Sequence, residues 1–285
     1  MTGVTGQLGT EILAELQRRA EGRLRGPALD IIAPEESTLD ITDRDALLAA
    51  IGTVEPDVII HPAAWTAVDD CEGDPDRAYR INTLGTRNVA EAARRVGAHM
   101  CYLSTDYVFD GTSPRPYSEW DDPNPLSVYG RSKLGGEREL DSGHTIVRTA
   151  WVNGRTGANM VKTVLRLASS GVALRFVNDQ RGSPTSAADL ASRVVDLSLG
   201  RHPGIFHVTN QGSTTWYEFA RLVLRAAGMD PARVEPIATT DLTPPRPAPR
   251  PANSVLDNAA LRLSGWSLLP NWDEAITGLV AELTA

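Results

Sequence analysis

The sequence contains only two cysteines among its 285 residues, Cys71 and Cys101, and they show neither a disulfide pattern nor metal-ligand spacing. The five histidines are scattered along the chain, so we predict no metal site. No apolar run is long enough to span a membrane, and no signal peptide precedes the first motif. We therefore expect a soluble, cytoplasmic protein whose thiols stay reduced.

An excess of positive charge is also missing. The formal net charge of -8 gives no general attraction to nucleic acid or to an anionic membrane surface. An anionic small molecule would need local donors instead, such as arginine side chains or helix N-termini. The hydrophobic fraction of 41% is ordinary, and the length suits one large domain or two smaller domains that share a core. These features favour a small-molecule partner.

The N-terminus carries a glycine motif, Gly3, Gly6 and Gly9, which opens onto a helical pattern of apolar residues. Such glycines allow a tight turn and a close approach of the backbone to a pyrophosphate, which the following helix N-terminus then faces. A glycine-rich turn that only caps an ordinary helix is the alternative. The motif should follow an apolar strand, yet only Met1 and Thr2 precede Gly3. Either the start codon is assigned too late or the central strand is missing, and we favour the first explanation.

Strands and helices alternate through the first half of the chain. A capping box from Thr42 to Asp45 and the pair Asp74–Pro75 predict two helix starts. Apolar runs of the kind found in buried parallel strands lie at 28–33, 57–60, 100–103 and 145–151. This alternation predicts an α/β fold with a doubly wound parallel sheet of the Rossmann type.

Beyond residue 150 the pattern loosens into shorter strands and helices. We expect a dinucleotide-binding domain over 1–150, which the segment near 186–208 rejoins, and a smaller C-terminal α/β substrate domain over 151–285. The proline-rich run 243–251 suits neither a helix nor a central strand, so we interpret it as an ordered extended loop. This loop would bring Arg246 and Arg250 near the substrate.

A tyrosine and a lysine four residues apart, Tyr129 and Lys133, would lie on one face of a helix. An ammonium beside a phenol favours the phenolate, so the tyrosine pKa, ordinarily about 10, can approach neutrality. That arrangement suits a proton donor at a carbonyl group that is being reduced. The spacing alone is common on amphipathic helices, but here Thr105 ends a predicted strand some two dozen residues earlier.

These motifs resemble the extended form of the short-chain dehydrogenase/reductase superfamily, and nearly the whole chain is similar to the dTDP-4-dehydrorhamnose reductase family. The most specific match is the run Ser-Thr-Asp-Tyr-Val-Phe-Asp-Gly at 104–111. Further matching stretches lie at 5–9, 39–42, 63–69, 128–137, 148–152, 179–185 and 250–254.

The resemblance implies an oxidoreductase that uses NADPH or NADH to reduce the C4 ketone of a dTDP-linked 4-keto-6-deoxysugar, most simply dTDP-4-dehydro-L-rhamnose to dTDP-L-rhamnose. Tyr129 would donate the proton, Lys133 would activate it and anchor the cofactor ribose, and Thr105 would orient the substrate oxygen. The residues expected to bind the cofactor, besides Tyr129 and Lys133, are Gly3, Gly6, Gln7, Leu8, Gly9, Asp40, Ile41, Ala63, Ala64 and Trp65. Those expected to contact the substrate are Thr105, Asp106, Trp151 and Arg250.

Some features leave alternatives open. Residues 34–37 offer neither a clear ribose-binding aspartate nor an arginine for a 2′-phosphate, so NADH and NADPH both remain. His61–Pro62 replaces an Asn–Ala type of pair and Trp65 replaces a smaller ring, which leaves the exact sugar open. Some family members dimerise through a divalent cation held by surface carboxylates. The resemblance thus allows Mg²⁺ and a homodimer, but the sequence assigns no residues to either.

Three other functions compete with this one. A dehydratase would need an acid–base carboxylate pair after Thr105, and here Asp106 is followed by Tyr107 and not by glutamate. A reductase for another dTDP-deoxysugar, in antibiotic or surface-glycan synthesis, stays open. A non-enzymatic regulatory subunit, such as that of methionine adenosyltransferase, would share the fold, but the intact Thr105, Tyr129 and Lys133 argue against it.

Overall fold

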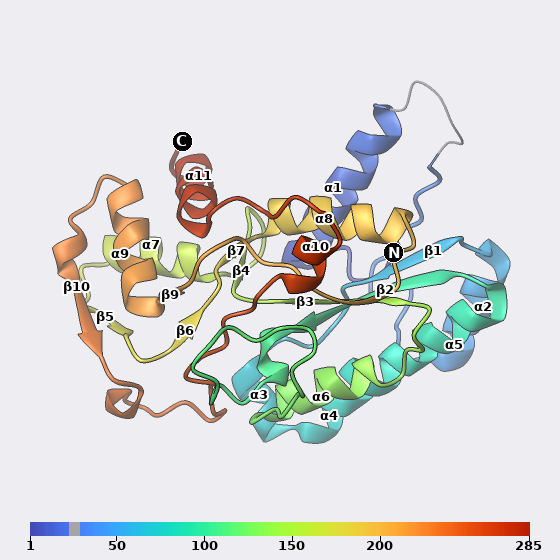
Figure 1. Cartoon of the computed structure of the whole chain (residues 1–285), viewed down its shortest axis with the longest axis horizontal. Coiled ribbons are helices and arrows are strands. Elements are labelled where there is room, and N and C mark those ends of the chain that lie inside the picture. Colours follow the sequence, from blue (N-terminus) through green and yellow to red (C-terminus); the bar gives the residue numbers. More distant parts are fainter. Residues whose placement is uncertain (23–28) are drawn as a thin grey trace.

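A parallel four-stranded sheet forms the centre of the computed structural model, which describes residues 1–22 and 29–285 (Figure 1). The strands lie in the order β1-β2-β3-β8, and every neighbouring pair is parallel. Their bounds are Val58–His61, His99–Thr105, Thr145–Thr149 and Gly204–His207. All residues of β2 and β3 are buried, as expected when helices cover both faces of a sheet.

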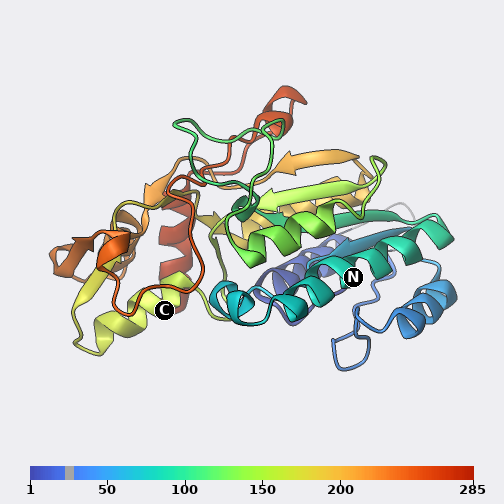
Figure 2. The same cartoon turned by 90° about the horizontal axis from the view of Figure 1, so that it is seen from below.

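Helices cover both faces of this sheet (Figures 1 and 2). One face carries α1 (Gln7–Glu21) and α8 (Ala187–Leu199), which pack together over a core that includes Ile12 and Val194. The helices on the other face are α2 (Arg44–Val54), α4 (Pro75–Tyr79), α5 (Thr86–Val96) and α6 (Val128–Glu137). The predicted doubly wound α/β fold is confirmed.

The N-terminal residues extend the sheet beyond β1 without forming a regular strand. The backbone N–H of Thr2 donates to the Ile60 carbonyl at 3.1 Å, and the Met1 amino group donates to the Ile32 carbonyl. The predicted strand at 28–33 is wrong for its described part, since residues 29–33 have no strand structure. The neighbouring N-terminal segment has only two residues, Met1 and Thr2, before the glycine turn, which is too short for a regular ladder of strand hydrogen bonds with 29–33. Ala28 lies outside the described residues.

A π-helical turn, η1 (Arg80–Gly85), joins α4 to α5, so that 75–96 form one long helical segment. It begins as predicted, with Pro75 at the first position and the Asp74 carboxylate accepting from the Arg77 N–H at 3.0 Å. The turn lets the Asn82 side chain bond both the N–H and the carbonyl of Trp65, at 2.8 and 3.1 Å. This helix therefore fixes the loop after β1.

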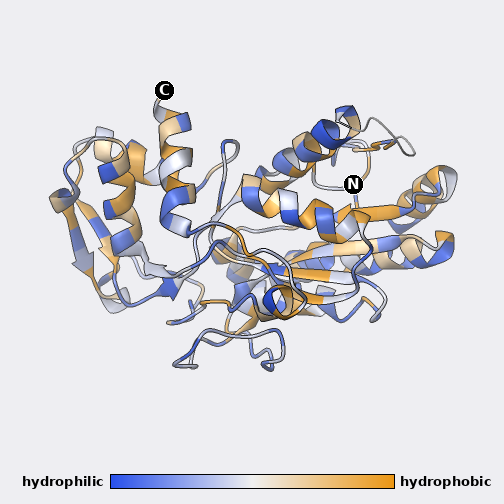
Figure 3. Ribbon diagram, turned by 45° about the horizontal axis from the view of Figure 1, so that its top comes forward, coloured by the Kyte–Doolittle hydropathy of each residue, from blue (hydrophilic) through white to orange (hydrophobic). Residues whose placement is uncertain are grey.

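A second, smaller unit has its own core and lies at the left in Figure 1. Its parallel pair β5 (Leu174–Val177) and β10 (Val234–Ile237) is flanked by α7 (Met160–Ser169), α9 (Trp216–Ala226) and α11 (Trp272–Thr284). The inward faces of these helices are apolar, as Figure 3 shows by colour. Two short strand pairs, β4–β7 and β6–β9, lie between the units. Their bounds are Val152–Asn153 with Thr185–Ser186, and Arg181–Gly182 with Thr214–Thr215.

Shorter elements complete the chain, and two predicted boundaries are wrong. Helix α2 is capped by Asp43, whose carboxylate accepts from the Ala46 N–H at 3.0 Å, and not by Thr42. The strand predicted at 145–151 ends at Thr149, because Trp151 has a left-handed backbone with φ of 45°. No helix in the described part of the chain is long and apolar enough to cross a membrane. The remaining elements are α3 (Val68–Gly73), η2 (Asp106–Val108), η3 (Pro231–Arg233), η4 (Thr239–Asp241) and α10 (Ala259–Leu263).

Candidate active site

Two adjoining cavities lie at the carboxyl ends of β1, β2 and β3, the edge at which parallel α/β sheets bind ligands. Their volumes are about 630 and 490 Å³. Both are lined by Gly3, Gly6, Pro62 and Ala64, so the glycine loop stands between them. We call the larger one the outer cavity and the smaller one the inner cavity.

The glycine loop leaves no room for side chains on its inner side. A Cβ atom at Gly9 would lie 1.9 Å from the Gly3 carbonyl oxygen, and one at Gly3, whose φ is +60°, would lie 2.7 Å from the Ala63 nitrogen. Helix α1 begins here, with Gly6 as an N-cap that offers no side-chain acceptor and with no acidic residue in the first turn. The N–H groups of that turn are thus free to bind a phosphate. This geometry fits a dinucleotide diphosphate.

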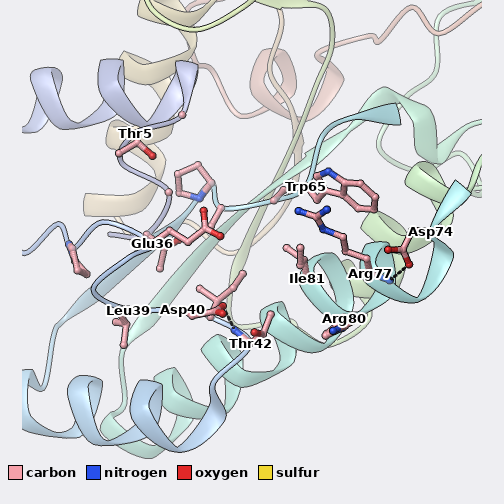
Figure 4. A pocket seen from close by; sticks show the side chains of 18 residues that line it. Thr5, Glu36, Leu39, Asp40, Thr42, Trp65, Asp74, Arg77, Arg80 and Ile81 are labelled. Atoms are coloured by element: carbon pink, nitrogen blue, oxygen red, sulfur yellow. Dashed lines mark hydrogen bonds between the residues drawn. The ribbon is translucent and has the colours of Figure 1, made fainter. Parts of the chain in front are cut away.

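The outer cavity brings together the predicted cofactor residues Asp40, Ile41, Ala63 and Trp65 (Figure 4). The Arg77 guanidinium stacks on the Trp65 ring at 4.5 Å from its centroid, so the larger ring at this position has a partner of its own. The sequence reasoning missed several other lining residues, because the fold brings them here from separate segments. They are Thr2, Thr5, Pro34, Glu36, Leu39, Thr42, Asp74, Arg77, Arg80 and Ile81.

The inner cavity brings together the residues expected to act in catalysis, Thr105, Tyr129 and Lys133, at the ends of β2 and along α6. Asp106, Trp151, Gln7, Leu8 and Gly9 line it as well. The Gln7 side chain is fully engaged with the loop after β4: it donates to the Val152 carbonyl and accepts from the Gly154 N–H and the Asn159 amide. Residues that the sequence reasoning missed include Thr149, Asn153, Met160 and Trp216.

The electrostatics of Tyr129 differ from the expectation. Burial raises the pKa of this phenol, and the neighbouring Thr105 hydroxyl offsets only part of the effect. Burial also lowers the pKa of Lys133 to about 7, although the Glu137 carboxylate opposes this. The Lys133 ammonium lies over the Tyr102 ring, 4.1 Å from its centroid. The phenol is therefore protonated, as a proton donor must be.

Thr105 and Asp106 form a hydrogen-bonded turn at the end of β2. The Thr105 hydroxyl donates to Asp106 Oδ1 at 3.0 Å and accepts from the Tyr107 N–H at 3.2 Å. Asp106 Oδ2 makes no hydrogen bond within the described part of the chain, although the residue is only 3% exposed. Burial raises the pKa of this carboxyl group to about 7.

A buried ion pair holds α6 against the central sheet. The Glu137 carboxylate accepts two hydrogen bonds from the Arg148 guanidinium, at 2.9 and 2.7 Å, and a third from the Ser104 hydroxyl. These contacts tie α6 to β2 and β3, and so fix the helix that carries Tyr129 and Lys133. A buried charge is tolerated when it is paired and hydrogen-bonded in this way.

Trp151 lies in an aromatic stack between the two units. Its ring is parallel to that of Trp216 from α9, with an interplanar angle of 6° and centroids 3.5 Å apart. Gly182 packs against the same ring, since a Cβ atom there would lie 2.3 Å from Trp151 Cε2. No sequence motif indicates this stack, because it joins three segments that are distant along the chain.

Arg250 is engaged by a carboxylate of the protein. It forms a two-bond ion pair with the Asp69 carboxylate, one of whose contacts is Nη2 to Oδ2 at 2.8 Å, and it lines neither cavity. The extended loop predicted at 243–251 is present, and Arg246 also contacts Asp69. Among the described residues, no group of three or more His, Cys, Asp or Glu side chains is arranged to hold a metal ion.

Comparison with known proteins decides the family. The model of the RmlD substrate binding domain matches residues 1–285. The chain belongs to the RmlD family. It is 42% identical to the dTDP-4-dehydrorhamnose reductase of Streptomyces griseus over 97% of this chain and 91% of that one. It is 40% identical to a probable dTDP-4,6-dihydroxy-2-methyloxan-3-one 4-ketoreductase of Streptomyces antibioticus, over 100% and 95%.

Among solved structures, the dTDP-4-dehydrorhamnose reductase of Bacillus anthracis in complex with NADP is similar, with a TM-score of 0.91 and 38% identity. The match covers 99% of this chain and 97% of that one. The expected resemblance to RmlD-type oxidoreductases of the extended short-chain dehydrogenase/reductase fold is thus confirmed.

Proposed function

We propose that this chain reduces the C4 ketone of a dTDP-4-keto-6-deoxyhexose with NADPH or NADH, and that dTDP-4-dehydro-L-rhamnose is the substrate and dTDP-L-rhamnose the product. The observation that carries the proposal is the inner cavity, in which Thr105, Tyr129 and Lys133 meet beside the glycine loop. The similarity to reductases of this name supports the choice of sugar nucleotide.

A bound reduced nicotinamide cofactor supplies the hydride that the C4 carbon of the ketone accepts. The glycine loop and the first turn of α1 would hold the diphosphate of this cofactor, and Asp40, Ile41 and Lys133 would contact its nucleoside parts. Tyr129 donates its proton to the oxygen of the developing alkoxide, and the Thr105 hydroxyl turns from Asp106 Oδ1 to donate a hydrogen bond to the same oxygen. A positioned proton donor of this kind accelerates a reaction by roughly 10²–10⁴-fold.

We also propose a division of labour between the two units. Residues 1–150, with the segment near 186–208 that contributes α8 and β8, bind the cofactor. The remainder of 151–285 binds the sugar nucleotide. The inner cavity is lined from both sides, by Lys133 from α6 and by Trp216 from α9.

The deciding assay adds dTDP-4-dehydro-L-rhamnose to the purified protein and follows oxidation of NADPH and of NADH by absorbance. Turnover with this sugar, and slower turnover with dTDP-4-keto-6-deoxy-D-glucose, is expected. One rival function is the reduction of a different dTDP-deoxysugar. The 40% identity to a probable dTDP-4,6-dihydroxy-2-methyloxan-3-one 4-ketoreductase supports this rival. Faster turnover of another 4-ketohexose would establish that rival, and binding without any turnover would indicate a regulatory protein.

Tyr129→Phe should lose nearly all turnover, because the ring keeps its place but has no proton to donate. Its dissociation constant for NADPH, measured by fluorescence titration, should stay within about twofold of the wild-type value. This ratio corresponds to a change of about 0.4 kcal/mol in binding free energy. Tyr79→Phe, at an exposed position of α4, is the matched control and should have wild-type activity. Near-normal turnover of Tyr129→Phe would refute the assignment of Tyr129 as proton donor.

A further inference from the structure

We propose that Tyr102 is a positioning residue for Lys133: its ring holds the lysine ammonium by a cation–π contact, and its hydroxyl holds the backbone of the same residue. The catalytic meaning of this role rests on the proposed function, but the contact itself does not. Tyr102 lies in the middle of β2 and is fully buried. No sequence motif marks it.

The contact joins β2 of the sheet to α6, the helix that carries Tyr129 and Lys133. The Lys133 Nζ atom lies 4.1 Å from the centroid of the Tyr102 ring, well within the range of a cation–π interaction. The Tyr102 hydroxyl donates to the Lys133 carbonyl at 3.3 Å. Gly136, one turn further along α6, makes room for the phenol, because a Cβ atom there would lie 2.4 Å from the Tyr102 oxygen.

Burial explains why the ammonium needs such a partner. Lys133 is only 2% exposed, and a buried ammonium without compensation tends to lose its proton. A ring face attracts a cation through its quadrupole, and this attraction strengthens where water is excluded. The aromatic ring therefore favours the charged form of Lys133, against the desolvation that lowers its pKa.

The other titratable groups around Lys133 do not replace this contact. Glu137, one turn away on α6, also raises the Lys133 pKa, but its carboxylate is shared with two hydrogen bonds from Arg148 and one from Ser104. His61 from β1 stacks on Tyr102, with ring centroids 5.7 Å apart, and is neutral because burial lowers its pKa to about 3. Burial raises the pKa values of Tyr102 and Tyr129, so both phenols are also neutral.

The sequence makes the test unusually direct, because the chain has only two lysines, Lys133 and Lys162. Lys162 is exposed at its tip, where Nζ donates to the carbonyls of Arg155 and Gly157, and it serves as an internal reference. In protein labelled with ¹³C at the lysine Cε, a pH titration followed by NMR gives both pKa values without cofactor or substrate.

Tyr102→Phe keeps the ring face and Tyr102→Leu removes it. We expect the Lys133 pKa to stay near the wild-type value in Tyr102→Phe and to fall by about one pH unit in Tyr102→Leu. Lys162 should not change in either variant. If Tyr102→Leu fails to fold, 3,4,5-trifluorophenylalanine at position 102 keeps the shape and weakens the ring quadrupole, and it should lower the Lys133 pKa relative to Tyr102→Phe. Equal Lys133 pKa values in the ring and no-ring variants would overturn the proposal.

A kinetic measurement separates this proposal from the proposed function. With dTDP-4-dehydro-L-rhamnose and NADPH, the alkaline limb of the kcat/KM profile should move to lower pH in Tyr102→Leu by the same amount as the NMR value. A purely structural role would lower kcat/KM at every pH and leave the limb in place, which would count against the proposal. An NMR shift in a protein without reductase activity would refute the function and leave the positioning role supported.

Discussion

Asp106 ends β2 with a carboxyl group that is almost fully buried, and its environment sets a pH dependence of stability. Burial raises its pKa to about 7, against a value near 4 in the unfolded chain. Between these values the folded state binds the proton and the unfolded state does not, so the free energy of unfolding falls as pH rises from about 4 to 7.

Asp106→Asn removes this titration while keeping the shape of the side chain. Relative to wild type, the variant should gain stability progressively from pH 4 to pH 7, by about 2–4 kcal/mol at the upper end, and no more above it. Urea unfolding at a series of pH values measures this. Asp110→Asn is the control of opposite sign, because hydrogen bonds from Thr112 and Asn124 lower the pKa of Asp110 and stabilise its charged form. A constant difference in the free energy of unfolding between wild type and Asp106→Asn at all pH values would contradict the raised pKa of the Asp106 carboxyl group.

At the scale of elements, the stack of Trp151 on Trp216 and Gly182 joins the end of β3 to α9 and β6. The left-handed backbone at Trp151 is unusual for a bulky residue, so the surrounding contacts must hold it. The stack therefore shapes the wall of the inner cavity on the side of the smaller unit.

Gly182→Ala should push the Trp151 ring out of this place, because the new Cβ atom would overlap it. We expect a loss of about 1–3 kcal/mol in stability and a severalfold higher KM for the sugar nucleotide, with the NADPH dissociation constant unchanged. Gly52→Ala is the matched control: this glycine lies inside α2 with nothing near its Cβ position, so the change should stabilise the protein by up to about 1 kcal/mol. If both variants behaved alike, the packing at Gly182 would be irrelevant to the site.

At the scale of the whole molecule, the features that could be predicted from the sequence are those whose pattern lies within one short segment. Buried parallel strands and the helix that carries Tyr129 and Lys133 have patterns of their own, and the order of strands brings their ends to one edge. The contact of Lys133 with Tyr102 and the stack of Trp151 on Trp216 join segments that are distant along the chain, so no spacing reveals them. The same holds for the ion pair of Arg250.

That ion pair fastens the extended loop from the smaller unit to α3 on the sheet unit. The Arg250 guanidinium meets the Asp69 carboxylate with two hydrogen bonds, its side chain is 14% exposed, and it lowers the Asp69 pKa. The Ala248 N–H donates to the same carboxylate at 3.2 Å. The arginine is therefore held by the protein itself, although the family resemblance implies a contact with the substrate.

A double-mutant cycle of Asp69→Asn and Arg250→Gln distinguishes these two roles. If the pair is a clasp between the units, each single variant should lose about 1–3 kcal/mol of stability and the coupling energy should be about 1–2 kcal/mol. Arg246→Gln is the control at the same carboxylate and should lose less than about 0.5 kcal/mol, because Arg246 is 57% exposed. A substrate ligand would instead give additive stability changes, with a raised KM for the sugar nucleotide in Arg250→Gln alone. The clasp predicts that both variants of the pair raise this KM together, since losing either partner frees the same loop.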